Sequence, residues 1–112
     1  MISVTPERFD ALLDRALAEL PSWVTERMNN VVVFASAWPT PAQQQAARGR
    51  GLLLGLYEGV PVGDKHSAPS GTLPDRIRLF RSPILDEWIA RGDESLEHLV
   101  AHVLVHEVGH HF

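Results

Sequence analysis

The sequence contains no cysteine, and this absence limits what can hold the chain together or bind a metal ion. A disulfide framework and a thiolate metal site are both excluded. Any metal ligand must therefore come from an imidazole, a carboxylate or water. Basic residues are also few, since 10 Lys and Arg stand against 14 Asp and Glu. They form no basic run, so the sequence predicts no nucleic-acid partner.

Long apolar runs are lacking as well. No segment approaches the roughly 18 apolar residues that span a bilayer, and Met1 to Glu7 do not resemble the start of a signal peptide. We therefore expect a cytoplasmic protein without a membrane contact. The 112 residues, 45% hydrophobic and 21% charged, are typical of one modest globular domain spanning residues 1–112. Nothing in the pattern indicates an oligomeric state.

Two longer segments have the apolar spacing of amphipathic helices. The first begins at Pro6, where Thr5 can cap it, and Pro21 stops it after Leu20. The second begins at Asp93 or Ser95 and runs to the end of the chain. Its predicted buried side consists of Leu96, Leu99, Val100, Val103 and Leu104.

The middle of the chain has strand-like segments rich in β-branched, aromatic and leucine residues. Strands are expected at residues 30–35, 52–58 and 76–81, with surface connections at residues 38–50 and 61–74. Gly55 inside the second strand indicates a bulge or a close backbone approach. A short helix is predicted to start at Ser82–Pro83, continue through Ile89 and break at Gly92. Helices and strands together predict an α+β fold.

The last helix carries the sequence His106-Glu107-Val108-Gly109-His110, an HExxH motif. Histidines four residues apart lie one turn above each other on a helix and can coordinate one metal ion together. Glu107 lies beside that ion and can take a proton from a metal-bound water. Two imidazoles suit zinc, which is the predicted cofactor. The small Gly109 is expected to let the site pack closely against its floor.

The other histidines are weaker candidates for ligands. His98 and His102 continue the four-residue spacing, but each step drifts about 40° around the helix. An exposed or core position is therefore favoured for both. His111 points about 100° away from His110 and cannot share its metal face while helical. His66 is most simply a solvated loop residue.

Three blocks of sequence resemble a small bacterial family of zincin-like minimal zinc metallopeptidases. They are GLYEGVP at residues 55–61, LPDRIRLFR at 73–81 followed by Pro83–Ile84, and HEVGHHF at 106–112. The resemblance implies an α+β, zincin-like fold in which a small twisted sheet packs on the active-site helix and one sheet edge borders the cleft. It also implies zinc ligands at His106 and His110 and a general base at Glu107.

In this family the motif continues as HExxHxxGxxD, and the aspartate is the third zinc ligand. The sequence ends at Phe112, so the domain is expected to lack this third-ligand segment. Water, a buffer anion or a donor from another chain is expected to complete the coordination. The Phe112 carboxylate can do so only if the helix end bends back, because in a straight helix residue 112 points about 200° around from His110. Within the chain, His66 and Asp64 are the remaining candidates.

Two functions follow from these observations. The leading hypothesis is a zinc-dependent metallopeptidase that hydrolyses a peptide or protein substrate paired with the edge of residues 52–58. The alternative is a catalytically weak or inactive zincin-fold module that binds peptides or proteins. A closed structural metal site is disfavoured, because it has no use for Glu107 as a base. Tyr57 and the arginines of the third strand are candidates for stabilising an oxyanion by residue type only, and a structural role is favoured for each.

Overall fold

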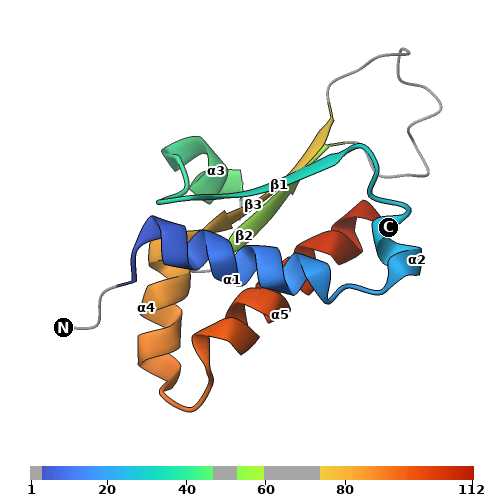
Figure 1. The fold of residues 1–112 in the computed structure, drawn as a ribbon. Coiled ribbons are helices and arrows are strands. Elements are labelled where there is room, and N and C mark those ends of the chain that lie inside the picture. The colour runs from blue at the N-terminus through green and yellow to red at the C-terminus, as the bar shows by residue number, and fades with distance from the viewer. Residues whose placement is uncertain (1–3, 47–52, 60–73) are drawn as a thin grey trace.

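The computed structural model describes residues 4–46, 53–59 and 74–112, which form a mixture of helices and one sheet (Figure 1). In chain order the elements are α1 (Pro6–Ala18), α2 (Ser22–Thr25), β1 (Val31–Ser36), α3 (Pro41–Ala46), β2 (Gly55–Glu58), β3 (Asp75–Phe80), α4 (Arg81–Arg91) and α5 (Leu96–His111). This arrangement confirms the predicted α+β class.

The three strands form one sheet in the order β1-β3-β2. β1 runs parallel to β3, with Val31 opposite Asp75 at the start of the pairing. β2 runs antiparallel to β3, with Gly55 opposite Leu79. In the described part of the chain β2 is therefore an edge strand, as the sequence predicted for this segment.

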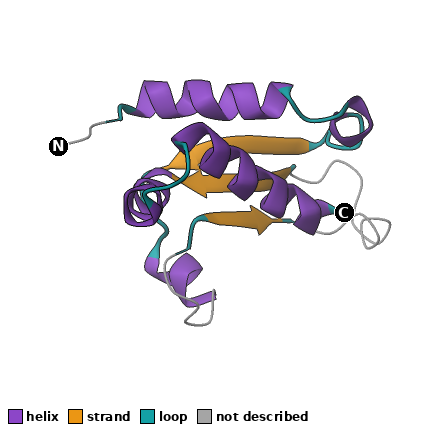
Figure 2. Cartoon of the chain, turned by 90° about the horizontal axis from the view of Figure 1, so that it is seen from below, coloured by secondary structure: helices purple, strands orange, loops and turns teal. Residues whose placement is uncertain are grey.

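One face of the sheet is covered by α1 and α5, which cross at an angle and contact each other (Figures 1 and 2). α1 lies toward the β1 side of the sheet, whereas α5 lies against β2 and β3. α4 packs against both α5 and β3. The motif-bearing helix therefore occupies the centre of the fold and touches the edge strand directly.

The core forms between this covered face and the two helices. Along β3, Ile77 and Leu79 are fully buried, while Arg76 and Arg78 point to the opposite face. The predicted apolar side of α5 is confirmed, because all five of its members are buried. α1 contributes three buried residues to the same cluster: Phe9, Leu13 and Ala16. The sequence pattern therefore predicted the core-facing sides of both helices.

The opposite face of the sheet is organised around Arg78. Its guanidinium lies 4.6 Å from the centre of the Phe34 ring. It also contacts the Glu58 carboxylate and the Ser36 hydroxyl, each at 3.3 Å. These contacts hold the three strands together on this face. Arg78 thus has the structural role that the sequence analysis favoured for it.

Two predictions for helices were incomplete. The predicted surface connection at residues 38–50 contains the exposed helix α3. Its signal was present in the sequence: the Thr40 hydroxyl accepts from the Gln43 N–H, and the Gln43 side chain accepts from the Thr40 N–H. This reciprocal pair is a capping box. The short α2 was also missed, and α1 ends at Ala18 rather than at Leu20.

The boundaries near α4 also differ from the prediction. α4 begins at Arg81, one residue earlier than expected, and Ser82 does not cap it. The Ser82 N–H instead donates to the Ala37 carbonyl, which ties the helix start to the end of β1. Gly92 ends α4 in the left-handed conformation, with φ 73°. Ser95, one of the two predicted candidates, caps α5 through its hydroxyl.

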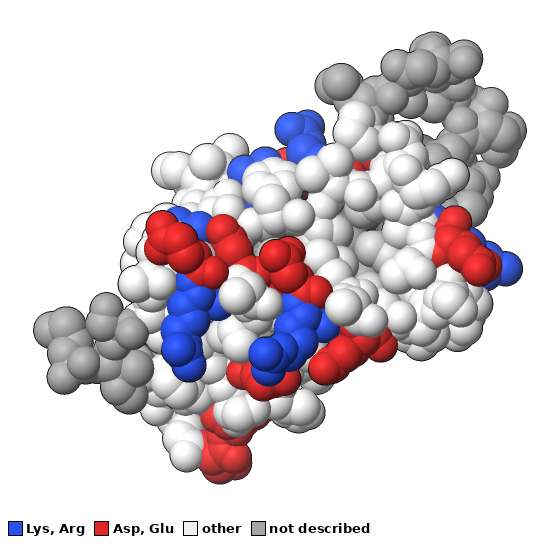
Figure 3. Space-filling model, viewed as in Figure 1, with Lys and Arg blue, Asp and Glu red and all other residues white. Residues whose placement is uncertain are grey.

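Charged side chains of both signs are interspersed on the face shown in Figure 3. On α4, Arg91 contacts Glu87 at 2.6 Å and Glu94 at 2.9 Å. Such exposed pairs contribute little to stability, typically about 0.2–1 kcal/mol each. None of the helices described here has the length and apolar character needed to cross a membrane.

Truncation of Leu104 to alanine is expected to lower the free energy of unfolding by about 2–5 kcal/mol. Leu104 is fully buried in the core beneath the motif, and the surrounding helices and strands cannot fully close the resulting cavity. Urea unfolding followed by circular dichroism measures this loss. The control is Val105→Ala on the adjacent, 55% exposed residue, expected within about 0.5 kcal/mol of the wild type. Equal stabilities for the two variants would contradict the core assignment.

Candidate metal centre

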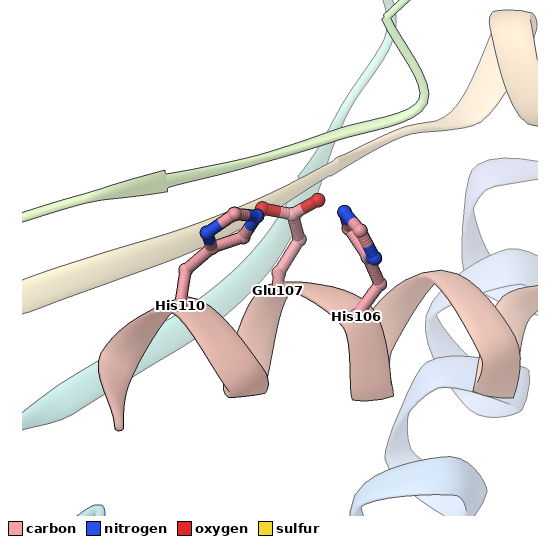
Figure 4. A group of neighbouring side chains, drawn as sticks. All are labelled: His106, Glu107 and His110. Atoms are coloured by element: carbon pink, nitrogen blue, oxygen red, sulfur yellow. The ribbon is translucent and has the colours of Figure 1, made fainter.

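The final two turns of α5 bring His106, Glu107 and His110 together (Figure 4). One potential ligand atom from each residue lies within 4.8 Å of the others. The two imidazole rings are 5.0 Å apart between centroids and nearly perpendicular, at 83°. Both histidines are exposed, whereas Glu107 is buried at 6% exposure. The cluster therefore has an open side and a buried side.

The core-facing side of α5 determines this orientation. Val100, Val103 and Leu104 are buried, and Glu107 and His111 continue the same stripe at helical spacing. The two histidines of the motif are offset from this stripe and face outward. Packing of the apolar side thus aims the imidazoles at solvent and places the carboxylate against the sheet.

Glu107 lies against the edge strand at Gly55. A Cβ atom at Gly55 would be 2.8 Å from Val103 Cγ1 and 3.0 Å from Glu107 Cγ. Only glycine leaves room for β2 to approach α5 this closely. The close backbone approach predicted for Gly55 is therefore confirmed.

The main chain of β2 also contacts α5. The Phe80 N–H donates to the Leu54 carbonyl at 2.9 Å, which sets the alternation of the antiparallel pair. By that alternation the main-chain groups of Gly55 and Tyr57 point away from β3. The Tyr57 N–H donates a hydrogen bond to the Glu107 carboxylate. The edge strand therefore orients the carboxylate of the motif.

The surroundings of Glu107 change its acidity. Burial raises the pKa of the carboxyl above its ordinary value of 4.5. The His110 and His106 rings and the Tyr57 N–H oppose this rise but do not cancel it. A carboxylate with a raised pKa is a better proton acceptor, which is a property of a general base.

The raised pKa also predicts how stability depends on pH in the metal-free protein. As the pH rises above 4.5, the unfolded chain loses the Glu107 proton before the folded chain does. Glu107 therefore increases the free energy of unfolding at lower pH. This contribution is lost as the pH rises through the raised pKa. Urea unfolding from about pH 4 to about pH 8 should show Glu107→Gln gaining stability relative to the wild type. If the stabilities of the two proteins change with pH in parallel, the raised pKa of Glu107 is contradicted.

Gly55→Ala should disturb the site more than the fold. The added methyl group must displace Val103, Glu107 or the strand itself, at a cost of about 1–3 kcal/mol. We expect the variant to fold but to lose the alignment of Glu107. Comparing urea unfolding with zinc-dependent turnover separates the two effects. Gly109→Ala is the matched control on α5, because a Cβ there meets no atom within 4 Å.

The same observation corrects the prediction made for Gly109. The residue is exposed and does not let the site pack against a floor; Gly55, on the facing strand, allows the close approach instead. His98 and His102 are exposed and outside the cluster, as favoured, and His98 contacts Glu94. The candidates His66 and Asp64 lie outside the described residues.

His111 is a core residue with 2% exposure. Its Nε2–H donates to the Arg27 carbonyl at 2.9 Å, because a carbonyl can only accept. Its Nδ1 lies 3.4 Å from the Asp75 carboxylate, a close electrostatic contact without a good hydrogen bond. The sequence analysis assigned His111 correctly to a position away from the metal face.

Asp75 has a role that was not predicted from the sequence. This carboxylate is 4% exposed and accepts a hydrogen bond from the Tyr57 hydroxyl at 2.5 Å. Burial, and then this hydrogen bond, raises the pKa of Tyr57 above its ordinary value, so the hydroxyl keeps its proton. Tyr57 thus has the structural contact favoured for it. The sequence signal for the role of Asp75 was an acidic residue at the start of a buried strand.

The donor atoms of the cluster are compatible with zinc. Two ligands of one zinc ion, each about 2.0–2.1 Å from the metal, are separated by no more than about 4.2 Å. Separations within 4.8 Å therefore require only small side-chain rotations. Within residues 4–46, 53–59 and 74–112 no further His, Asp or Glu joins the cluster. The described residues thus supply two imidazoles and one buried carboxylate.

The fold and the site together define a zincin-like domain, in which an HExxH helix lies beneath the edge strand of a small sheet. The family model of the zincin-like metallopeptidases matches residues 28–112, and the chain belongs to this family. The resemblance seen in the sequence is thereby confirmed.

A solved structure supports the same fold. The chain is similar to a conserved hypothetical protein from Thermus thermophilus, with 25% sequence identity and a TM-score of 0.60. The alignment covers 96% of this chain and 92% of that chain. A comparison with curated proteins finds no match.

Proposed function

We propose that this chain is a zinc-dependent metallopeptidase that hydrolyses peptide bonds in a peptide or protein substrate. The observation that carries the proposal is the placement of Glu107. Its carboxylate lies between two outward-facing imidazoles, is buried, and is held by the main chain of an edge strand. Family membership supports the same activity.

His106 and His110 would hold the zinc ion through their ring nitrogens. When bound, zinc acts as a Lewis acid that polarises the scissile carbonyl and acidifies water. Glu107 would accept the proton of the attacking water and transfer it to the leaving amine. The raised pKa of Glu107 suits the first transfer, because it makes the carboxylate a better proton acceptor.

The substrate would bind along the outer edge of β2. The main-chain groups of Gly55 point away from β3 there, and an extended peptide can pair with such an edge. α5 contacts this strand, so a paired peptide passes close to the cluster. The predicted edge thus remains our candidate for substrate binding, in a bacterial protein that we place in the cytoplasm.

A peptidase assay with metal removal tests the proposal. The zinc-loaded protein is incubated with a mixture of peptides, and new termini are identified by mass spectrometry. We expect cleavage that a chelator abolishes and added zinc restores. Zinc binding without cleavage of any peptide would overturn the proposed activity and favour a peptide-binding module with the same fold. Absence of zinc binding would overturn the metal site itself.

A further inference from the structure

A buried polar cluster lies directly behind the candidate metal centre. It consists of Tyr57 on β2, Asp75 at the start of β3 and His111 at the end of α5. The Tyr57 ring packs edge-on against the His111 ring, with centroids 5.9 Å apart. The cluster therefore joins three elements that are distant in sequence.

This cluster is closely enclosed. Asp75 and His111 are 4% and 2% exposed, and a Cβ at Gly59 would clash with the Asp75 carboxyl group. The Arg27 carbonyl closes the remaining side by accepting from His111 Nε2. Polar groups buried this deeply are unfavourable unless they are paired, so apolar residues would fill the space at less risk to stability. In this cluster the Tyr57 hydroxyl bonds Asp75 and His111 bonds the Arg27 carbonyl, whereas His111 Nδ1 lies 3.4 Å from Asp75 without a hydrogen bond. Directional hydrogen bonds specify one arrangement of the elements that they join.

The last turn of α5 needs such a constraint. His110 lies in the last described turn of α5, directly before His111, and its ring is exposed to solvent. A rotation of this turn by roughly 10° moves a side chain about 5–6 Å from the helix axis by roughly 1 Å. Zinc coordination tolerates deviations of only about 0.2 Å. Whatever fixes the rotation of His111 also fixes that of His110, its neighbour.

Tyr57 connects this buried cluster to Glu107, the proposed base. Its hydroxyl binds Asp75, while its main-chain N–H binds the Glu107 carboxylate. One residue of the edge strand therefore contacts both the cluster behind the site and the carboxylate within it.

We propose that Tyr57, Asp75 and His111 form a positioning cluster that holds the last turn of α5, and with it His110, in register with the strand that orients Glu107. These residues act through their neighbours and do not touch the metal. The inference rests on the proposed metal site, since its consequence is the geometry of that site.

The test measures cobalt binding, because cobalt substitutes for zinc and its visible absorption reports ligand geometry. Asp75→Asn is expected to weaken cobalt affinity by about tenfold or more and to change the spectrum, as is usual when a partner behind a ligand is lost. Tyr57→Phe should have a smaller effect in the same direction. Asp86→Asn, on the exposed surface of α4, is the matched control and should bind like the wild type.

Stability is measured in parallel by thermal unfolding. A role in stability alone would lower the melting temperature while leaving the affinity and spectrum of the folded variants unchanged. Wild-type cobalt affinity and spectrum in folded Tyr57→Phe and Asp75→Asn would therefore overturn the proposal. If Asp75→Asn does not fold, Tyr57→Phe alone decides the outcome by the same criterion.

A metal-free measurement separates this inference from the proposed function. Amide hydrogen exchange of residues 108–111 reports the order of the last turn without any metal. We expect faster exchange there in Tyr57→Phe than in the wild type or Asp86→Asn. Unchanged exchange would overturn the positioning cluster, whereas failure of the wild type to bind cobalt or zinc would overturn the metal site only.

Discussion

Replacement of His106 by alanine is expected to weaken zinc binding by about two to three powers of ten. Structural zinc sites with four ligands bind with roughly 10–16 kcal/mol, or about 2.5–4 kcal/mol for each ligand. Each 1.4 kcal/mol corresponds to a factor of about ten in affinity. Because the described cluster contains only two imidazoles, the loss of one leaves no comparable ligand to replace it.

The measurement is a competition titration against a chromophoric chelator of known zinc affinity. His110→Ala should show the same loss. His98→Ala is the matched control, since this histidine is on the same helix, exposed and outside the cluster. Wild-type affinity in His106→Ala would show that zinc binds elsewhere.

The second large effect is expected from Glu107→Gln, which should retain zinc and lose peptide hydrolysis. A general base typically contributes about 10²–10⁴ to the rate, and the amide cannot accept the proton. Steady-state kinetics on a cleaved peptide should therefore show kcat reduced by at least about a hundredfold. Zinc affinity, measured by the same titration, should change by no more than a few fold.

Glu97→Gln is the control for this substitution. Glu97 is an exposed glutamate in the first turn of the same helix, far from the motif in sequence. It should leave both turnover and zinc affinity at wild-type values. Turnover retained in Glu107→Gln would remove this residue as the base and would direct attention to another proton acceptor.

The two expected properties of Glu107 oppose each other. The buried carboxylate that we propose as the base is also expected to lower the stability of the metal-free fold as it ionises. Glu107→Gln should therefore produce a more stable but inactive protein. Such a trade-off is common where catalysis requires a charged group in a buried position.

Much of the fold could be predicted because it depends on apolar periodicity. The buried sides of α1 and α5 follow helical spacing, and β3 alternates between buried and exposed residues. α3 was missed because none of its six residues is a large apolar residue and none is buried, so no apolar stripe marks them. The capping box at Thr40 was the only local signal, and such signals identify a helix start without its length.

The candidate metal cluster could be predicted because it is local, since both histidines and Glu107 lie in the final two turns of one helix. The surroundings of the cluster could not be predicted in the same way. Gly55 and Asp75 reach it through strand pairing across many residues, and periodicity carries no information about register. The glycine in the strand indicated a close approach, but it did not identify α5 as the approaching element. The role assigned to Gly109 was wrong for the same reason.

The packing of α1 on α5 has a consequence for how this protein is made. Phe9 and Leu13 are buried against a core that includes Val103 and Leu104, roughly ninety residues later in the chain. At about 5–20 residues per second, synthesis of that interval takes on the order of 5–20 s. During this time the apolar side of the first helix lacks its native partner. α5 also brings Glu107 against Gly55, so a nascent chain can form its proposed hydrolytic centre only after α5 has been synthesised and has packed on the sheet.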